Sequence, residues 1–315
     1  KFMRTQSAFF HDWEHRFQAY GGGLGNGKCI EETALIATEH GVKRIADIEP
    51  GEMVWTVDEN LKLSAQRVTA RIDSGVLPEW SVRLDNGLSL GVTPWHPMLR
   101  MQPTVRRVRG GATKREDGTR IDRRSRAVPA AEWVPLSECK PGDRLAVAID
   151  YPEGQPCGYT DKELFLLGVL LGDGGLTSRA SVKVTIGHEA VLEAVRDALP
   201  TGCAISKVGQ SKYDYALTGN GQIGGNWALN FLRALNLHGT NSHTKFIPPQ
   251  FLSAKKSEIA ALLSGLFLTD GWVDNNYVGY CSVSETLLDG VQGLLIRLGI
   301  RSQKCKRFVK YKGTL

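Results

Sequence analysis

Apolar and polar residues alternate with two different periods along the chain, and the change falls near residue 160. Before it, runs such as EMVWTVD, QRVTARIDSG, EWSVRLDNGLSLGVT and DRLAVAID are rich in β-branched and aromatic residues and are separated by turn residues. Such runs are typical of short strands joined by tight turns. After residue 160, apolar residues recur at helical spacing in segments that alternate with strand-like runs. The pattern therefore predicts an all-β N-terminal half followed by an α+β half.

The α+β half contains two copies of one unit. The segments LLGVLLGDGGL and LLSGLFLTDGW align, and their aspartates, Asp173 and Asp270, take the same place in each copy. Repetition of a whole α/β unit predicts two half-domains of αββαββα pattern related by a pseudo-twofold axis. Helices are expected at residues 161–173, 189–199, 227–237, 257–270 and 285–298, and strands at 181–186, 204–208, 213–217, 277–283 and 303–311.

Each of the two repeated helices carries small residues four positions apart. Gly168 aligns with Gly265, and Gly172 aligns with Thr269, so each helix has one small face. Small faces let two helix backbones approach closely. If the helices pack along them, both aspartates emerge side by side at helix C-termini, where the helix dipole is negative. Two carboxylates at that place repel each other, and divalent cations bound beside them relieve the repulsion. Oxygen ligands suit Mg²⁺, and metals of this kind stabilise the oxygens of a phosphodiester displacement.

Both segments resemble the LAGLIDADG motif of homing endonucleases. TKFIPPQFL is similar to the lysine-containing block of that family, and SVSETLLDGVQGLLIRLGIRS resembles the helix after the second motif. The resemblance covers about residue 161 to the C-terminus. It implies a pseudo-dimeric monomer in which Asp173 and Asp270 bind Mg²⁺ and act with Lys245, which stabilises charge or activates water. It also implies that the partner is double-stranded DNA, cut in both strands at a specific site. The sheets would form a basic saddle that sits on the major groove of this DNA.

The N-terminal run GGGLGNGK, followed by a cysteine, nearly matches the P-loop pattern G-x-x-x-x-G-K-[ST]. Gly22, Gly27 and Lys28 fit it, but Cys29 stands where Ser or Thr would bind Mg²⁺. One interpretation is a P-loop NTPase with a C-terminal nucleic-acid-binding domain, in which IEETALIATEHG forms the helix after the loop. A further interpretation is a DNA-binding module that keeps the saddle but has lost catalysis.

Other motifs resemble an intein, a protein-splicing element with a Hint fold. The stretch from CIEETALIATEHG to MVWTVD resembles the first intein block, with Cys29 as nucleophile. LDNGLSLGVTPWHPML resembles the second, with Thr93 and His96 in its T-x-x-H signature, and WVPLSECKPGDRLAVAI is similar to the strand pair that ends the N-terminal Hint half. The resemblance implies an N–S acyl shift, in which the Cys29 thiol attacks the Lys28 carbonyl. His96 would protonate the leaving nitrogen, and Thr93 would help to form the oxyanion site.

The two resemblances together predict the domain organisation. Residues 1–28 are expected to be the end of a host protein, the N-extein, interrupted within its P-loop; the host is expected to be a P-loop ATPase. Residues 29–150 are the N-terminal Hint half with an inserted basic loop at 105–127, residues 151–159 are a linker, and residues 160–315 are the endonuclease. The C-terminal intein blocks have no counterpart and the second repeat is shorter than the first. The chain is therefore expected to be the N-terminal fragment of a longer precursor.

The composition of the chain narrows the classes of protein to which it could belong. Hydrophobic residues make up 42% of the chain and charged residues 23%, which suits packed domains and excludes a disordered tail. The longest apolar runs, 166–171 and 262–268, are too short to cross a bilayer, and no signal peptide is evident, so a cytoplasmic protein is expected. No cysteine belongs to a CxxC pair, which argues against a zinc site. A net charge of +6, with an arginine-rich stretch from Arg106 to Arg126, permits nucleic-acid binding.

Overall fold

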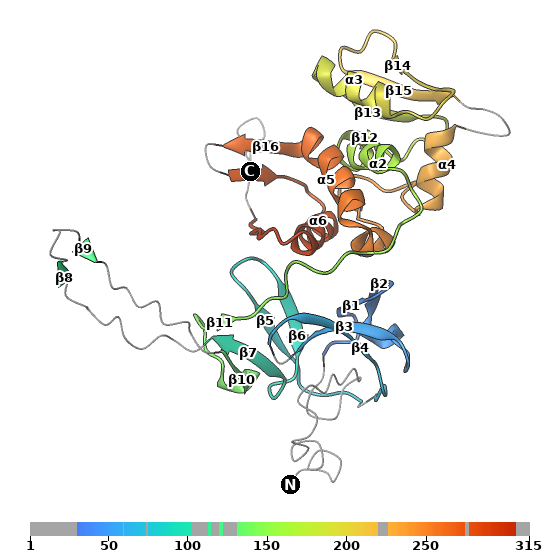
Figure 1. Cartoon of the computed structure of the whole chain (residues 1–315). Coiled ribbons are helices and arrows are strands. Elements are labelled where there is room, and N and C mark those ends of the chain that lie inside the picture. The colour runs from blue at the N-terminus through green and yellow to red at the C-terminus, as the bar shows by residue number, and fades with distance from the viewer. Residues whose placement is uncertain are drawn as a thin grey trace. The chain divides into compact units, whose positions relative to one another are not determined.

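The computed structural model divides into two compact units. The first contains the described residues of 1–34, 70–83 and 89–148, and the second those of 35–69, 84–88 and 149–315. The described residues hold five α-helices, all after residue 160, and several small sheets (Figure 1). No helix among them is long and apolar enough to cross a membrane. The structure describes residues 30–58, 60–73, 75–101, 113–114, 120–121, 131–219, 226–274 and 277–306.

The first repeat of the α+β half begins with α2 (Asp161–Asp173), whose bounds are those predicted. A capping box starts the helix, because Thr160 and Glu163 each accept the backbone N–H of the other. The strands form an antiparallel sheet of order β12-β13-β15-β14, and α3 lies along it (Figure 1). The remaining elements are β12 (Gly174–Gly175), β13 (Val182–Thr185), α3 (Glu189–Ala198), β14 (Cys203–Lys207), β15 (Asp214–Gly219) and α4 (Trp227–Ala234). The helix α4 ends earlier than predicted, since Asn236 adopts a φ of 57°.

The second repeat follows the same order over its first half. After the 3-10 turn η3 (Pro249–Ser253), its elements are α5 (Lys256–Asp270), β16 (Gly271–Asp274), β17 (Tyr277–Tyr280) and α6 (Glu285–Arg297), which correspond to α2, β12, β13 and α3. The strand predicted at 303–311 is wrong for residues 303–306; the remainder of that segment lies outside the described residues. Within residues 303–306, the backbone forms a hydrogen bond with a turn and not with a strand: the Lys304 N–H donates to the Asn86 carbonyl over 2.9 Å.

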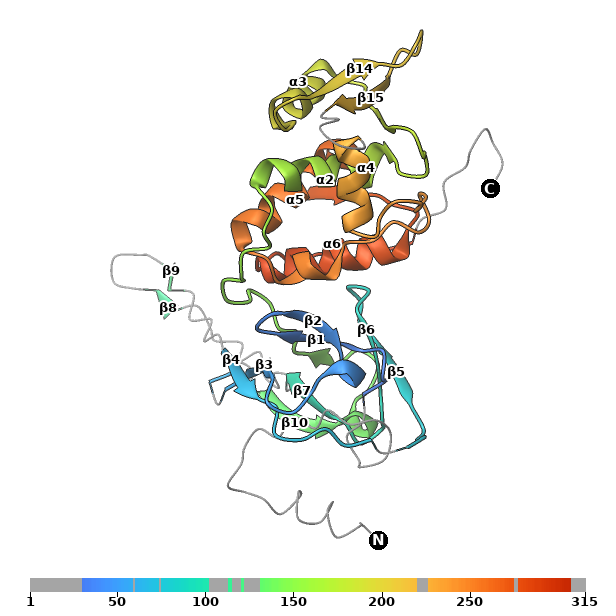
Figure 2. The ribbon, with the colours of Figure 1, turned by 90° about the vertical axis from the view of Figure 1, so that its right-hand side faces the viewer.

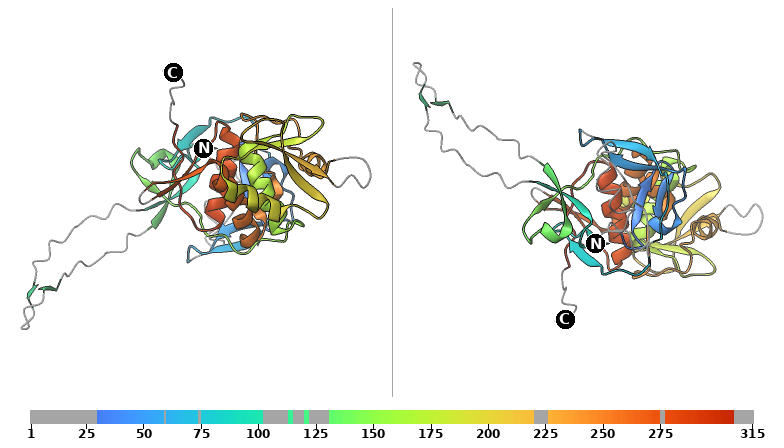
Figure 3. Two further views of the ribbon diagram at one scale, coloured as in Figure 1. Left: turned by 90° about the horizontal axis from the view of Figure 1, so that it is seen from above. Right: turned by 90° about the horizontal axis from the view of Figure 1, so that it is seen from below.

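The helices α2 and α5 pack face to face along their glycines, as the spacing of small residues predicts. A Cβ atom on Gly168 would lie 2.3 Å from the Leu262 carbonyl oxygen, and one on Gly265 would lie 2.1 Å from the Phe165 carbonyl oxygen. Neither contact could be relieved by turning a side chain, because both atoms belong to the facing backbone. Figure 2 shows the two helices side by side, and Figure 3 shows them from two opposite directions.

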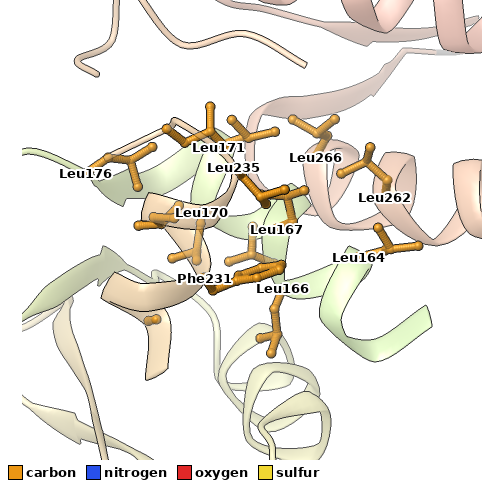
Figure 4. Close-up of a cluster of buried hydrophobic side chains, with 14 of the residues drawn as sticks. Leu164, Leu166, Leu167, Leu170, Leu171, Leu176, Phe231, Leu235, Leu262 and Leu266 are labelled. Carbon is orange, nitrogen blue, oxygen red and sulfur yellow. The ribbon is translucent and has the colours of Figure 1, made fainter. Parts of the chain in front are cut away.

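The apolar side chains of α2 fill the core of the second unit. Five leucines of the helix are at most 1% exposed, and they point to more than one side of it. A helix that is apolar around most of its circumference is buried among several neighbours. Packing on all these sides fixes the direction of α2 and therefore the position of its last residue. The labelled side chains of this cluster are Leu164, Leu166, Leu167, Leu170 and Leu171 from α2, with Leu176, Phe231, Leu235, Leu262 and Leu266 (Figure 4).

The region before residue 150 contains short antiparallel strands and, among its described residues, no α-helix. In the second unit, a sheet of order β2-β1-β3-β4 is formed by β1 (Leu35–Thr38), β2 (Gly41–Arg44), β3 (Met53–Val57) and β4 (Leu63–Arg67), with the 3-10 turn η1 (Ile45–Asp47). In the first unit, β5 (Trp80–Arg83) pairs with β6 (Ser89–Val92), β8 (Thr113–Lys114) pairs with β9 (Arg120–Ile121), and a sheet of order β10-β7-β11 is formed by β7 (Pro97–Met101), β10 (Ala131–Pro135) and β11 (Arg144–Leu145), with the 3-10 turn η2 (Leu136–Glu138).

Several local predictions for this region are wrong. The helix that the P-loop interpretation assigns to IEETALIATEHG is absent, because residues 35–38 form the strand β1 and pair with β2 across a tight turn. The run QRVTARIDSG belongs to a strand only up to Arg67. Val68 still exchanges backbone hydrogen bonds with Gly51 and Glu52, and no strand follows it among the described residues of this run. The run DRLAVAID contributes only the two residues of β11. The expectations for residues 1–28, for Cys29 and for most of the loop 105–127 concern residues outside the described ones.

Candidate functional site

The two aspartates of the repeated motifs end the two packed helices. Asp173 is the last residue of α2 and Asp270 the last residue of α5, and each is followed by a glycine in an extended conformation. Between them the helices touch: a Cβ on Gly172 would lie 2.0 Å from the Thr269 hydroxyl and 3.3 Å from a carboxylate oxygen of Asp270. The carboxylate of one helix therefore lies over the last turn of the other, and the two acidic groups share one end of the helix pair.

The environment of these carboxylates disfavours their charge. Desolvation, and then repulsion from Asp270, raises the pKa of Asp173 above its usual range. Desolvation likewise raises the pKa of Asp270, and the charge of Lys245 opposes that shift. Neither carboxylate accepts a hydrogen bond from any described residue, and both stand at the negative ends of helix dipoles. A pair of acidic groups held in this way favours a bound cation.

Lys245 lies beside the acidic pair. Its side chain is only 6% exposed, and its Nζ donates to the Gly172 carbonyl oxygen over 2.7 Å. Desolvation lowers its pKa, while the charges of Asp270 and Asp173 oppose that shift. The structure thus brings together the three residues that the sequence had assigned to one site from positions far apart in the chain.

The loop that carries Lys245 is fixed by its own hydrogen bonds. The Lys245 N–H donates to the Asn241 carbonyl over 3.0 Å, and the Asn241 N–H donates to the Thr244 hydroxyl over 2.9 Å. Ser284, which is fully buried and caps α6, donates its hydroxyl to the Lys245 carbonyl over 2.6 Å. Sequence reasoning did not find Ser284 as a supporting residue; its place just before the helix predicted at 285–298 marks it as a cap, but not as a contact of Lys245.

The acidic pair fits a divalent cation such as Mg²⁺. Carboxylate oxygens are its preferred protein ligands, and Mg²⁺ commonly takes one or two of them together with waters and substrate phosphates. Among the described residues, no cluster contains three or more His, Cys, Asp or Glu side chains that could hold a metal. Asp173 and Asp270 are the residues of this pair that could hold such a cation.

The other sequence-predicted residues lie in the first unit. Thr93 is 1% exposed, and its carbonyl accepts the His96 N–H over 2.9 Å, so a tight turn joins the two residues. Cys29 lies outside the described residues, but the residue after it, Ile30, forms an antiparallel bridge with Val92, the residue before Thr93. The backbone at Ile30 therefore pairs with the residue that precedes the Thr93–His96 turn.

The exposed residues of the first-repeat sheet combine hydroxyl groups with lysine. Along β13, β14 and β15 they are Lys183, Thr185, Ala204, Ser206, Lys207, Thr218 and Gly219. Two of them are basic, and three carry a hydroxyl group.

Comparison with known proteins identifies the C-terminal part of the chain. Residues 257–314 match a family described as a LAGLIDADG-like domain. This segment includes α5, β16, β17 and α6, and so it contains one of the two acidic motifs. The C-terminal part of the chain is therefore of the LAGLIDADG type.

Similar segments occur in longer proteins whose names state different functions. An iron–sulfur cluster assembly SufBD family protein of Mycobacterium leprae is 26% identical over an alignment of 321 residues. The alignment covers 91% of this chain and 34% of that protein. A replicative DNA helicase DnaB of Synechocystis is 28% identical over 308 residues, 90% of this chain and 32% of the helicase. Protein RecA of Mycobacterium tuberculosis is 25% identical over 295 residues, 87% of this chain and 33% of RecA. The chain spans about a third of the length of these relatives.

Proposed function

We propose that the chain is an intein that carries a Mg²⁺-dependent LAGLIDADG homing endonuclease. The observation that carries the nuclease part is the meeting of Asp173 and Asp270 at one end of two glycine-packed helices, with Lys245 bonded to the Gly172 carbonyl beside them. The match of residues 257–314 to a LAGLIDADG-like domain supports the same conclusion. The substrate of this site is double-stranded DNA, and the reaction is hydrolysis of one phosphodiester in each strand.

Asp173 and Asp270 would hold Mg²⁺, which when bound supplies positive charge against the scissile phosphate. The chain's own contribution is positional. The glycine contacts set the separation of the two helices and so of the two carboxylates, because no Cβ stands between the backbones at Gly168 and Gly265. The Gly172 carbonyl and the Ser284 hydroxyl together hold Lys245 beside the pair, where its ammonium group stabilises the negative charge that develops on phosphate oxygens.

The intein part of the proposal is supported by the relatives and by the first unit. An element of about 300 residues that recurs within proteins of unrelated named functions is expected of an insertion that moves between hosts. In the first unit, the Ile30–Val92 bridge and the Thr93–His96 turn lie together, as an N–S acyl shift at Cys29 would require. His96 acts as the general acid for the leaving nitrogen, and Thr93 polarises the Lys28–Cys29 peptide. The interrupted host is a P-loop protein.

The alternative is a P-loop NTPase with a C-terminal nucleic-acid-binding domain. The helicase and RecA among the relatives give it some support. It requires a helix directly after the glycine-rich loop, whereas residues 35–38 form a strand. The Cys29 side chain also lacks the hydroxyl that the P-loop uses for Mg²⁺.

Cleavage of a plasmid that carries the host gene without the inserted element tests the nuclease assignment. Asp270→Asn and Asp173→Asn should each abolish double-strand cleavage in Mg²⁺, because each removes one negative ligand. DNA affinity should remain within a few-fold of wild type, since little basic surface is lost. Asp214→Asn is the matched control: Asp214 lies in the first-repeat sheet and bonds Ser211 and Thr185. Double-strand cleavage at the wild-type rate by either motif variant would refute the assignment of that aspartate.

A further inference from the structure

Tyr280 stands next to the acidic pair, although no motif marks it. It ends β17, where its backbone is opposite Gly271, the residue directly after Asp270. The next residue, Cys281, donates its N–H to the Asp270 carbonyl over 3.2 Å. The Tyr280 ring lies against Phe267, one turn before Asp270 on α5, with 5.4 Å between the ring centroids. These three contacts hold the tyrosine at the C-terminal end of α5.

The hydroxyl of Tyr280 has no partner in the described part of the protein. Its oxygen is buried and makes no hydrogen bond there, although a buried hydroxyl normally finds a donor or an acceptor. Burial raises its pKa well above the usual range, and the charges of Asp270 and Asp173 add to the shift. A phenol hydroxyl can donate a hydrogen bond, and the backbone pairing and the ring contact place this one at the end of α5 where Asp270 lies. The carboxylates of Asp270 and Asp173 receive no hydrogen bond from the described residues.

The geometry points to Tyr280 as a positioning residue that donates a hydrogen bond to the Asp270 carboxylate when that carboxylate binds a divalent cation. Carboxylates that ligate a metal are usually held by donors behind them, and these donors fix the direction of the ligating oxygen. In that arrangement one oxygen of the Asp270 carboxylate would accept the Tyr280 hydroxyl and the other would face the cation. The inference rests on the proposed function, because it assigns a role only if Asp270 is a metal ligand.

The first repeat lacks this donor. The residue that faces Gly174, as Tyr280 faces Gly271, is the buried Val184. The pseudo-twofold symmetry of the site is thus broken by one hydroxyl. With a cation bound, Asp270 would therefore have a supporting donor that Asp173 lacks.

Calorimetric titration of the 315-residue chain with Mg²⁺ alone, together with thermal unfolding, tests the inference. Tyr280→Phe should weaken Mg²⁺ binding by roughly 10–100-fold, the usual effect of losing a partner of a ligand. Its unfolding midpoint without metal should be unchanged or raised, because the variant removes an unsatisfied buried group. Tyr277→Phe is the matched control in the same hairpin: its hydroxyl bonds Asp274 over 3.1 Å and the residue is 55% exposed, so its Mg²⁺ affinity should stay at the wild-type value.

Asp270→Asn separates failure of this inference from failure of the proposed function. If Asp270→Asn loses Mg²⁺ binding while Tyr280→Phe binds as tightly as wild type, the tyrosine has no positioning role and the metal assignment stands. If Asp270→Asn binds Mg²⁺ as tightly as wild type, the metal assignment falls and the role of Tyr280 falls with it. A lower unfolding midpoint in Tyr280→Phe would overturn the inference as well, since the hydroxyl would then be structural.

Discussion

At the scale of single residues, Ser284 links the start of α6 to the loop that carries Lys245. Its hydroxyl oxygen accepts the Leu287 N–H over 3.2 Å as a helix cap and donates its proton to the Lys245 carbonyl over 2.6 Å. One small side chain thus satisfies a helix end and a buried carbonyl at the same time. The position of the Lys245 ammonium therefore depends on a residue 39 positions later in the chain.

Ser284→Ala should destabilise the protein by about 1–3 kcal/mol, because it removes the cap and leaves the Lys245 carbonyl without its bond. Chemical denaturation followed by circular dichroism measures this. Cleavage by the folded variant should also slow, since Lys245 would no longer be held beside Gly172. Ser264→Ala is the control. Ser264 is exposed on α5, and its hydroxyl donates to the Ala261 carbonyl of the same helix, so this variant should be as stable as the wild-type protein or slightly more stable. Equal stability of both variants would contradict the role given to Ser284.

At the scale of elements, the separation of α2 and α5 is set by glycine. Gly168 and Gly265 face each other so closely that the Cα of either lies within 3.0 Å of the position of a Cβ on the other. This close approach brings the two helix C-termini, and with them the two carboxylates, to one place. The helix pair is therefore both the centre of the core and the frame of the candidate site.

Gly168→Ala should destabilise the protein by about 2 kcal/mol or more, because the new methyl group meets the backbone of the facing helix. Gly293→Ala, in contrast, should make the protein more stable. Gly293 lies within α6, where a Cβ would make only an ordinary contact of 3.5 Å with Leu252, so alanine should stabilise by about 0.5–1 kcal/mol through helix propensity. Thermal unfolding of the two variants compares them directly. A stable Gly168→Ala protein would mean that the helices are farther apart in solution.

At the scale of the whole molecule, splicing and DNA cleavage would reside on one chain, and the first can be tested independently of the second. A precursor that contains this chain, treated with dithiothreitol, should release an N-terminal segment that ends at Lys28. Cys29→Ala should prevent release, and His96→Ala should slow it by roughly 10²–10⁴-fold, as expected for loss of a general acid. His188→Ala, at an exposed histidine before α3, should have no effect.

The same variants, together with nucleotide binding, distinguish an intein from a P-loop NTPase. Thiol-dependent release that persists in Cys29→Ala would remove the basis for the intein assignment. ATP binding that is lost on Lys28→Ala would instead favour the P-loop NTPase. Equilibrium dialysis with labelled nucleotide measures that binding without any need for DNA.

The helices of the α+β half were predictable because each has a local signal. Helix α2 starts at the Thr160–Glu163 capping box and ends at Asp173, directly before a glycine, so its bounds agree with the prediction. The strands were less predictable. Val68 still bonds the backbone of Gly51 and Glu52. The residues after it have the composition of a strand but belong to no strand among the described residues, because β-propensity alone does not create a partner strand.

The sequence by itself determined that two helices with small faces end in aspartates, because spacing along a helix fixes which residues share a face. It also marked Lys245, Thr93 and His96 through local motifs. Only the tertiary structure decided that the Lys245 ammonium rests on the Gly172 carbonyl, that Ser284 supports it and that the Tyr280 hydroxyl is buried beside the acidic pair. These contacts join distant parts of the chain, and their strength comes from burial and from the absence of competing water, which no local pattern of residues records.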